Sequence, residues 1–349
     1  MEKVRLGRTN IMVSRVAFGG IPIQRVSEDF AVSVVKKCIS LGINFIDTAN
    51  AYTTSEQRIG KAISGKRNKL IIATKTLART REEVEKHLKL SLERLGTNYI
   101  DLYQFHNITD SDTLKAVLAD NGPMAVATEA KKHGLIRHIG VTSHSLDMAK
   151  ELVKSDCFET IMFPFNFITY EAANELLPLA NEHDVGFIAM KPLEGGRLDN
   201  ISLAFKYLLQ FPNVVTVVGI EKIQEIEEIA EILKQPLTFS AAEEAEVYKL
   251  RQELDRTFCR RCDYCQPCPQ EIPISLVMDY PSLYRRLPPE RIFVEFVADA
   301  MEKAAQCTEC GECEERCPYG LPIREMIEGY VAEYKVGKSK FIDSKPFNE

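Results

Sequence analysis

Eight short apolar runs recur along the chain up to about residue 218, roughly one every 25 to 35 residues, with helical patterns between them. This spacing is typical of repeated β/α units that close into a single barrel. An open sheet covered by helices also alternates strands and helices, but eight units within about 220 residues favour closure. The predicted fold class is therefore α/β, with a (β/α)8 TIM barrel. The runs are residues 16–18, 45–46, 70–73, 99–103, 139–141, 161–163, 187–190 and 214–218.

Local signals mark the ends of this barrel and the start of the C-terminal part of the chain. Residues 4–6 and 12–14 predict a short hairpin that plugs one end of the barrel. Capping boxes at residues 80–83 and 240–243 predict helix starts, and the second helix is expected to run through about Asp255. The expected parts are a barrel over 1–239, a linking helix over 240–257, a small, mainly helical domain over 258–335 with a loop at 279–290, and a tail over 336–349.

Charge and composition exclude several functional classes. The chain carries 44 Lys and Arg against 50 Asp and Glu, a formal charge of -6, and no basic stripe with interleaved aromatic residues. Nucleic acid is therefore not an expected partner. The first residues lack the apolar core of a signal peptide, and no run reaches the roughly 18 apolar residues of a membrane helix. We expect a cytoplasmic protein without a membrane partner, in which Cys38 and Cys157 are small buried apolar residues.

Four polar residues fall at or just after the ends of predicted strands, where TIM barrels place their chemistry. Asp47, Lys75 and His106 each follow an apolar run, and Tyr52 lies in the loop after Asp47. A lysine ammonium lowers the pKa of a neighbouring tyrosine hydroxyl, a carboxylate holds the lysine, and a histidine orients a carbonyl oxygen. Singly, each residue has a structural explanation as a helix cap, a solvated strand end or a satisfied polar group. Together they predict a catalytic site that protonates a carbonyl group as it receives hydride.

Over residues 3 to about 235 the sequence resembles the aldo-keto reductases. The resemblance implies an eightfold barrel that binds a nicotinamide cofactor in extended form and reduces an aldehyde or ketone, or oxidises the alcohol. It also implies that Tyr52 is the general acid, that Lys75 and Asp47 tune it, and that His106 orients the substrate. The matching positions are Leu6-Gly7-Arg8-Thr9, Phe45-Ile46-Asp47-Thr48-Ala49, Tyr52, Ser55-Glu56, Ile59-Gly60, Lys75 and His106.

The resemblance further implies a cofactor site along the later strand ends. Asn166 matches the family asparagine of this region. The segment that resembles the loop over the cofactor pyrophosphate, where glycines let backbone amides approach phosphate, is Lys191, Pro192, Leu193, Glu194, Gly195, Gly196 and Arg197. The positions that depart from the family pattern are Thr142 and Ser143 for a Ser-Asn pair, Met162 for a glutamine, and Met190 for an aromatic ring on the nicotinamide. We therefore expect altered contacts with the nicotinamide.

The turn after the last run carries the remaining cofactor candidates, Gly219, Glu221 and Lys222. It leads into a helix whose N-terminus is available to an anion. The family arginine for the extra phosphate of NADPH is not evident. Glu221 and Glu225 repel a 2'-phosphate, whereas an acid suits a ribose diol, and Lys222 acts in the opposite direction. The sequence therefore slightly favours NADH over NADPH.

Two cysteine runs, each followed by proline, organise the C-terminal domain. The second has the spacing of bacterial ferredoxins, in which the fourth cysteine binds the other cluster, and the first is one residue shorter before its fourth cysteine. This crossing predicts two 4Fe–4S clusters, whereas two four-cysteine zinc sites are the rival interpretation. The predicted ligand sets are Cys259, Cys262, Cys265 and Cys317 for one cluster, and Cys307, Cys310, Cys313 and Cys268 for the other.

The two halves of the chain carry electrons in different numbers. A hydride brings two electrons and a 4Fe–4S cluster passes one, so direct exchange needs a converter such as a flavin, for which no motif is evident. The clusters then serve a flavoprotein or ferredoxin partner, a bound flavin, or the structure of the domain. The leading hypothesis is an oxidoreductase acting on a small carbonyl compound or alcohol. The alternative is an electron-transfer or regulatory subunit whose barrel is a docking or sensing body.

Overall fold

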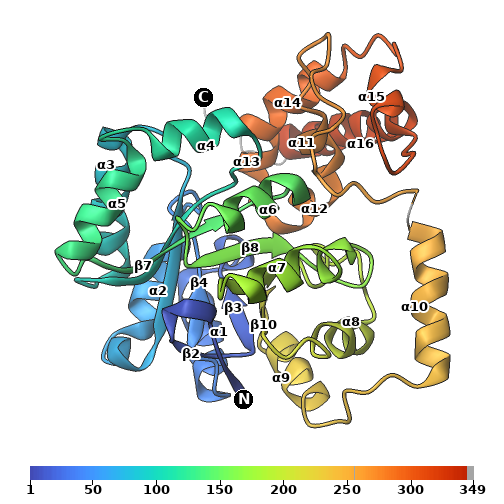
Figure 1. Cartoon of the computed structure of the whole chain (residues 1–349). Helices are drawn as coiled ribbons and strands as arrows, with labels where there is room; N and C mark the ends of the chain where they lie inside the picture. The colour runs from blue at the N-terminus through green and yellow to red at the C-terminus, as the bar shows by residue number, and fades with distance from the viewer. Residues whose placement is uncertain (255, 344–349) are drawn as a thin grey trace. The chain divides into compact units, whose positions relative to one another are not determined.

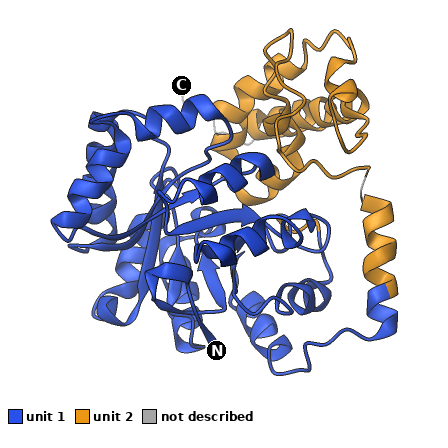
Figure 2. Cartoon of the chain, viewed as in Figure 1, with its two compact units in different colours: residues 1–194, 198–244 blue, residues 195–197, 245–349 orange. Residues whose placement is uncertain are grey.

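The computed structural model describes residues 1–254 and 256–343, and Figure 1 traces the elements in chain order. The chain divides into two compact units, which Figure 2 colours separately. Unit 1 comprises residues 1–194 and 198–244, and unit 2 comprises residues 195–197 and 245–349. The division at residue 244 falls inside the segment predicted as a linking helix.

Unit 1 contains a closed barrel of eight strands, in which every neighbouring pair is parallel. Each predicted apolar run overlaps one of these strands, and the runs at 70–73 and 99–103 begin one residue before theirs, which confirms the (β/α)8 class. The order around the barrel is β10-β3-β4-β5-β6-β7-β8-β9. The strands are β3 (Val16–Gly19), β4 (Phe45–Asp47), β5 (Ile71–Thr76), β6 (Ile100–Phe105), β7 (Ile136–Thr142), β8 (Thr160–Pro164), β9 (Gly186–Met190) and β10 (Val214–Gly219).

Helices follow the strands, as the predicted β/α alternation requires. The α-helices are α1 (Glu28–Ser40), α2 (Ser55–Ile63), α3 (Arg81–Leu95), α4 (Ser111–Leu118), α5 (Pro123–Lys132), α6 (Leu146–Lys154), α7 (Leu176–Glu182), α8 (Ile201–Leu208) and α9 (Ile223–Ile232). Short 3-10 turns lie at Gly7–Thr9, Pro22–Arg25, Arg67–Lys69 and Glu171–Ala173. The predicted start of α3 is confirmed, because Thr80 accepts a hydrogen bond from the backbone N–H of Glu83.

The barrel interior is filled by side chains at alternate strand positions. Its central apolar cluster takes residues from seven of the eight strands: Ala17, Phe45, Ala73, Leu102, Met162, Ile188, Val215 and Val217. The hairpin of β1 (Lys3–Arg5) and β2 (Met12–Ser14) adds Leu6 and Val13 to the same cluster. The hairpin therefore closes one end of the barrel, as predicted.

The two cysteines outside the clustered runs differ in burial. Cys38, in α1, is buried as expected. The expectation for Cys157 is wrong, because this residue lies in the loop between α6 and β8 and is exposed.

Unit 2 is helical. Its helices are α11 (Ile274–Met278), α12 (Tyr280–Arg286), α13 (Pro289–Phe293), α14 (Phe296–Ala304), α15 (Glu312–Glu315) and α16 (Ile323–Asp343). Helix α10 (Ala241–Leu254) spans the division between the units. Its predicted capping box is present, because Ser240 N–H donates to Glu243 Oε2 at 2.8 Å and Glu243 N–H donates to Ser240 Oγ at 3.3 Å. The predicted end at Asp255 lies outside the described residues.

Two expectations for unit 2 are corrected. Most of the loop predicted at 279–290 is helical, because Pro281 and Pro289 lie in the first turns of α12 and α13. Proline is tolerated there, since the first-turn N–H groups have no partner within the helix. The tail predicted from residue 336 is helical as far as Asp343, and its last part, 344–349, lies outside the described residues. The helical part is held by aromatic packing, since the Phe341 and Phe293 rings lie 5.3 Å apart.

Among the described residues, no helix combines the length and the apolar character needed to cross a membrane.

Candidate functional site

The four candidate catalytic residues come from three neighbouring strands. Asp47 ends β4, Lys75 lies near the end of β5, His106 directly follows β6, and Tyr52 lies in the loop between β4 and α2. Asp47 and Lys75 each follow an inward-facing core residue by two positions, so strand alternation turns both side chains into the barrel. The sequence prediction that they meet at the carboxyl ends of the strands agrees with this placement.

Asp47 and Lys75 form a buried ion pair, with Nζ 2.5 Å from Oδ2. Only 4% of Asp47 and 2% of Lys75 is exposed, and Lys75 Nζ also donates to the Thr48 carbonyl at 2.8 Å. Burial raises the pKa of Asp47, although Lys75 and Gln104 favour its carboxylate form. Burial alone would lower the pKa of Lys75, but Asp47 and Tyr52 outweigh it, so this pKa is raised. The pair therefore keeps an ammonium group at the base of the site.

Tyr52 and His106 complete this group. Lys75 Nζ lies 5.2 Å from the centroid of the Tyr52 ring. The Tyr52 and His106 ring centroids lie 6.1 Å apart, with the ring planes at 80°. The backbone N–H of His106 donates to the Thr76 carbonyl at 2.9 Å, which ties it to β5. An ammonium beside a phenol stabilises the phenolate left by proton transfer, so the arrangement can donate a proton to a carbonyl oxygen.

Two residues of this end of the barrel are missed by the sequence analysis. Gln104 Nε2 donates to Asp47 Oδ1 at 3.2 Å. The Arg79 guanidinium donates to the carbonyls of His106 at 2.6 Å and Asn107 at 3.2 Å, so it fixes the backbone that carries the His106 side chain. A polar residue at an inward position of a buried strand is the signal for Gln104. Arg79 has no such signal, because its contacts depend on two loops.

Thr142 and Ser143, predicted to contact the nicotinamide carboxamide, are buried and hydrogen-bonded within the protein. Thr142 Oγ1 accepts a bond from Asn107 N–H at 2.8 Å. Ser143 Oγ donates to the Ser145 carbonyl and accepts from the Ser145 N–H, both at 3.2 Å. A bound carboxamide has to share or replace these bonds.

Asn166 is likewise engaged within the protein, through both ends of its amide. Its Nδ2 donates to the Lys191 carbonyl at 3.0 Å and to Glu194 Oε1 at 3.2 Å. Its Oδ1 accepts from the N–H groups of Ile168 and Thr169, both at 2.8 Å. Asn166 therefore shapes the loop after β9, whatever it contacts in a cofactor complex.

The loop predicted to cover the pyrophosphate begins directly after Met190, which ends β9 and packs against the barrel core. Pro192 and Leu193 form its first turn, within unit 1. Gly195 and Gly196 have φ values of 68° and 86°, which suit glycine, and belong to unit 2.

The turn before α9 already holds a carboxylate. Gly219 ends β10, and the backbone N–H groups of Glu221 and Lys222 donate to Glu225 Oε2 at 2.8 Å and 3.0 Å. Burial raises the pKa of Glu221, and Arg25 opposes this effect. Two backbone amides just before the first residue of α9 are thus bound to the chain's own acid.

The two cysteine runs share left-handed backbone positions between their first and third cysteines. The second and fourth residues after the first cysteine have positive φ in both: Arg261 at 60° and Asp263 at 62°, and Glu309 at 56° and Gly311 at 83°. The left-handed positions recur at the same offsets although the residue types differ. The runs differ at the third cysteine, because Cys313 lies in α15 and Cys265 lies in a turn.

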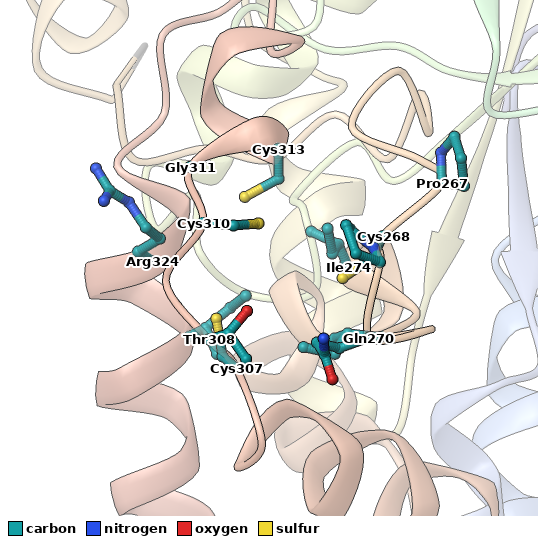
Figure 3. Close-up of a pocket in the computed structure, with 13 residues that line it drawn as sticks. Pro267, Cys268, Gln270, Ile274, Cys307, Thr308, Cys310, Gly311, Cys313 and Arg324 are labelled. Atoms are coloured by element: carbon teal, nitrogen blue, oxygen red, sulfur yellow. The ribbon is translucent and has the colours of Figure 1, made fainter.

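One small pocket in unit 2 is lined in part by Cys268, Cys307, Cys310 and Cys313. Figure 3 shows these four side chains around it, with Arg324 beside them. Cys268 belongs to the first run and the others to the second. The cavity therefore brings together the four residues that the ferredoxin-type crossing predicts for one cluster.

The other predicted set is also close together. Burial raises the pKa of Cys262, and the neighbouring Cys317 thiol raises it further. Burial raises the pKa of Cys259 and of Cys265 to about 12, with contributions from the neighbouring thiols. Iron binding therefore displaces protons from these thiols. Within residues 1–254 and 256–343, no three His, Cys, Asp or Glu side chains gather closely enough to hold a single metal ion.

Two family models match the chain. The model of the aldo/keto reductase family matches residues 15–202, more than half of the 349 residues. The chain belongs to the aldo/keto reductase family. A model described as a 4Fe–4S dicluster domain matches residues 258–322 of this aldo/keto reductase, so the iron–sulfur interpretation holds over the zinc rival.

Curated relatives of this aldo/keto reductase include named oxidoreductases. L-Galactose dehydrogenase of Arabidopsis thaliana is 32% identical over 217 residues, covering 57% of this chain and 67% of the relative. An uncharacterised oxidoreductase of Bacillus subtilis is 32% identical over 212 residues, with the same coverage of 57% and 67%. The NADH-specific methylglyoxal reductase of Escherichia coli is 27% identical over 228 residues, covering 57% and 69%. Family and relatives support an NAD(P)H-dependent oxidoreductase.

Solved structures agree on the fold of the barrel. The holo form of an aldo-keto reductase of Bacillus halodurans superposes with a TM-score of 0.63 at 26% identity, covering 72% of this chain and 96% of that one. An aldo-keto reductase of Klebsiella pneumoniae in complex with NADPH gives a TM-score of 0.61 at 20% identity, covering 72% and 95%. The second likeness concerns the fold alone.

Proposed function

We propose that this aldo/keto reductase reduces a small aldehyde or ketone, or oxidises the corresponding alcohol, with Tyr52 as the proton donor. The observation that carries the proposal is the buried Asp47–Lys75 pair, whose ammonium lies 5.2 Å from the centroid of the Tyr52 ring. A charged lysine in this position favours the tyrosinate produced when the carbonyl oxygen takes the proton. In this proposal His106 orients that oxygen, and its edge-on ring contact with Tyr52 supports the role.

A nicotinamide, when bound, supplies the hydride. Tyr52, Met190 and the hydroxyls of Thr142 and Ser143 all belong to strand ends or the loops after them, so polar donors and an apolar surface are present for the ring. These residues fit a nicotinamide if Thr142 and Ser143 bond its carboxamide in addition to their partners within the protein. Lys75 itself stays protonated, because Asp47 lies 2.5 Å from its ammonium and the pair is buried.

We favour NADH over NADPH as the hydride donor. Glu225 accepts hydrogen bonds from the N–H groups of Glu221 and Lys222. Its negative charge repels a 2'-phosphate at the same turn. Affinities for both cofactors, measured on the whole protein, test this preference. Tighter NADH binding, and a smaller gap in the Glu225→Gln variant, are expected. Clearly tighter NADPH binding in the unaltered protein contradicts it.

The eight clustered cysteines are proposed as ligands of two 4Fe–4S clusters, in the two crossed sets. The clusters would pass single electrons to or from a flavoprotein or ferredoxin, or stabilise unit 2. A Cys317→Ser variant separates the two roles. Loss of carbonyl turnover in a folded variant favours electronic coupling, and retained turnover favours a structural role. The cytoplasm, where thiols stay reduced, is the compartment we propose.

The main proposal is tested by Tyr52→Phe. Turnover across a panel of aldehydes and ketones with NADH and NADPH is expected to fall about 10²- to 10⁴-fold, the usual contribution of a general acid. Tyr248→Phe is the matched control, because Tyr248 is 66% exposed. Equal iron content and circular dichroism show that the variant is folded. Unchanged turnover in folded Tyr52→Phe rules out this role for Tyr52.

A second candidate function is an electron-transfer or regulatory subunit. It is favoured by one observation: Thr142, Ser143 and Asn166 are all hydrogen-bonded within the protein. Reduction of the clusters by a one-electron donor, without turnover across the carbonyl panel, is the result expected of such a subunit. Carbonyl turnover that depends on Tyr52 excludes it.

A further inference from the structure

Gln104 is a buried polar residue to which the proposed reaction gives no role. It lies in β6, two positions beyond the core residue Leu102, and is fully buried. Its Nε2 donates to Asp47 Oδ1 at 3.2 Å, while Lys75 Nζ lies 2.5 Å from Oδ2. Each oxygen of the Asp47 carboxylate is thus held from a different strand, Oδ2 from β5 and Oδ1 from β6.

The orientation of the Gln104 amide follows from chemistry. An ionised carboxylate only accepts hydrogen bonds, so the NH₂ end of Gln104 faces Asp47 and its Oε1 faces the interior. Within the described part of the chain, this oxygen is buried without a hydrogen-bond partner, and so is Oγ1 of Thr160 on β8. Both groups border Gly140 of β7. A Cβ at that position would lie 2.2 Å from Thr160 Oγ1 and 3.2 Å from Gln104 Cγ.

Glycine at position 140 therefore leaves room for the Gln104 side chain and the Thr160 hydroxyl on the same side of the interior. Thr160 has the O–H donor that Gln104 Oε1 requires, and one water between them would join the two groups. The three residues come from consecutive strands, β6, β7 and β8, and are paired in register. Gln104 and Thr160 thus add two polar groups to an interior whose central cluster is apolar, and Gln104 contacts Asp47.

We propose that Gln104 is a positioning residue that keeps Asp47 ionised and turned toward Lys75, with Thr160 and Gly140 supporting Gln104. Burial disfavours the ionised form of a carboxyl group, so each hydrogen bond donated to the carboxylate helps to keep it ionised. If Asp47 takes up a proton, the ion pair is lost, and Lys75 no longer holds its charge beside Tyr52. The other titratable groups grouped with Asp47 in the described structure are Lys75, Tyr52 and His106. The effect on turnover rests on the proposed function, because it passes through Tyr52.

Gln104→Met tests the proposal, since methionine keeps the length of the side chain and lacks the donor. The acid limb of kcat/KM is expected to move up by about one pH unit. Gln104→Glu, which places a second acid beside Asp47, is expected to move it further. Thr160→Val is expected to move it less, in the same direction. Thr216→Val is the matched control, because that hydroxyl is also buried without a partner, on β10.

A readout independent of turnover separates this proposal from the proposed function. The infrared band of the protonated Asp47 carboxyl, assigned by its loss in Asp47→Asn, is expected to appear at higher pH in Gln104→Met. If the unaltered protein turns over no carbonyl compound, the proposed function fails, and the band still decides the role of Gln104. An equal loss of activity at every pH with an unchanged band overturns the proposal. If Gln104→Met does not fold, an unshifted band in Thr160→Val and Gln104→Glu overturns it.

Discussion

The barrel site and the cysteine loops differ in how their buried ionisable groups are stabilised. In the barrel, Asp47 and Lys75 satisfy each other at 2.5 Å, so the site is assembled from protein alone. In unit 2, burial raises the pKa of the Cys259 and Cys265 thiols to about 12, so these groups stay neutral until a metal replaces their protons. The first site exists before its cofactor arrives, and the second is completed by its cofactor.

This contrast indicates where each half of the chain obtains its stability. Unit 1 has a continuous barrel core and closes its own hydrogen-bonding ladder. Apart from α16, the helices that lie wholly within unit 2 are short, and α11, α13 and α15 have five residues or fewer. Such helices depend on tertiary contacts. Iron is therefore expected to matter for the folding of unit 2 and little for the folding of unit 1.

The largest expected effect is the response to iron removal. Stripping iron from the whole protein with a chelator under oxidising conditions is expected to unfold unit 2 and leave the barrel intact. Limited proteolysis should then leave a resistant fragment ending near residue 244, and far-UV circular dichroism should lose the unit 2 helices. A single cooperative loss of both units would show that the barrel also depends on iron.

Next is the loss of the barrel ion pair. Lys75→Met is expected to lower carbonyl turnover by about 10²- to 10⁴-fold, because Tyr52 loses the charge that stabilises its deprotonated form. The iron content should remain that of the unaltered protein. Steady-state kinetics and iron analysis on the same preparation measure both. A parallel fall of iron and activity would show that the two sites are not independent.

The crossed ligand sets predict a graded effect in unit 2. Cys268→Ser and Cys317→Ser are each expected to lower the iron content from about eight to about four per chain, with different clusters lost. Electron paramagnetic resonance of the reduced protein should show a different remaining signal in each variant. Cys157→Ser is the matched control, since Cys157 is exposed and belongs to neither run. Identical remaining signals would contradict the crossing.

Much of this architecture is predictable from sequence because it depends on local pattern. The eight strands follow from apolar periodicity, and Asp47, Lys75 and His106 follow from their places after those strands. The helices at 280–293 escape prediction, because Pro281 and Pro289 signal a break in sequence but lie in first turns. Arg79 escapes because its partners are carbonyls, which every residue has.

The predicted cofactor-binding residues show the same limit of prediction from sequence. Residue types identify Thr142, Ser143 and Asn166 as candidates, but only coordinates reveal which of their atoms already hold bonds within the protein. The hydrogen bonds that Glu225 accepts from the backbone before α9 are likewise visible only in the coordinates. The sequence shows which hydrogen-bonding groups a residue has. Which of these groups are left for a cofactor depends on the contacts made in the folded protein.

The smallest expected effect concerns Glu159, a structural acid of the barrel. Burial opposes its charge, but hydrogen bonds from His138, Lys131 and the Ile139 N–H hold its pKa at about 2. A lowered folded-state pKa stabilises the fold above the unfolded value of about 4.3, and this contribution disappears as pH falls toward 2. Glu159→Gln is therefore expected to cost about 1 to 3 kcal/mol at pH 7.

Urea unfolding of the barrel at several pH values measures this cost. The difference between Glu159→Gln and the unaltered protein should shrink between about pH 4.5 and pH 2, and the iron content should not change. A pH-independent difference would assign the loss to packing rather than to the charge of Glu159.

The repeated φ pattern of the cysteine loops places different charges at equivalent positions of the two runs. Arg260 and Arg261 follow the first cysteine of one run, whereas Thr308 and Glu309 follow that of the other. Further charges lie beside them, because Asp279 pairs with Arg261 and Arg324 lines the cavity of Cys307. Net charge near a cluster contributes to its reduction potential, so the two clusters are expected to be reduced at different potentials.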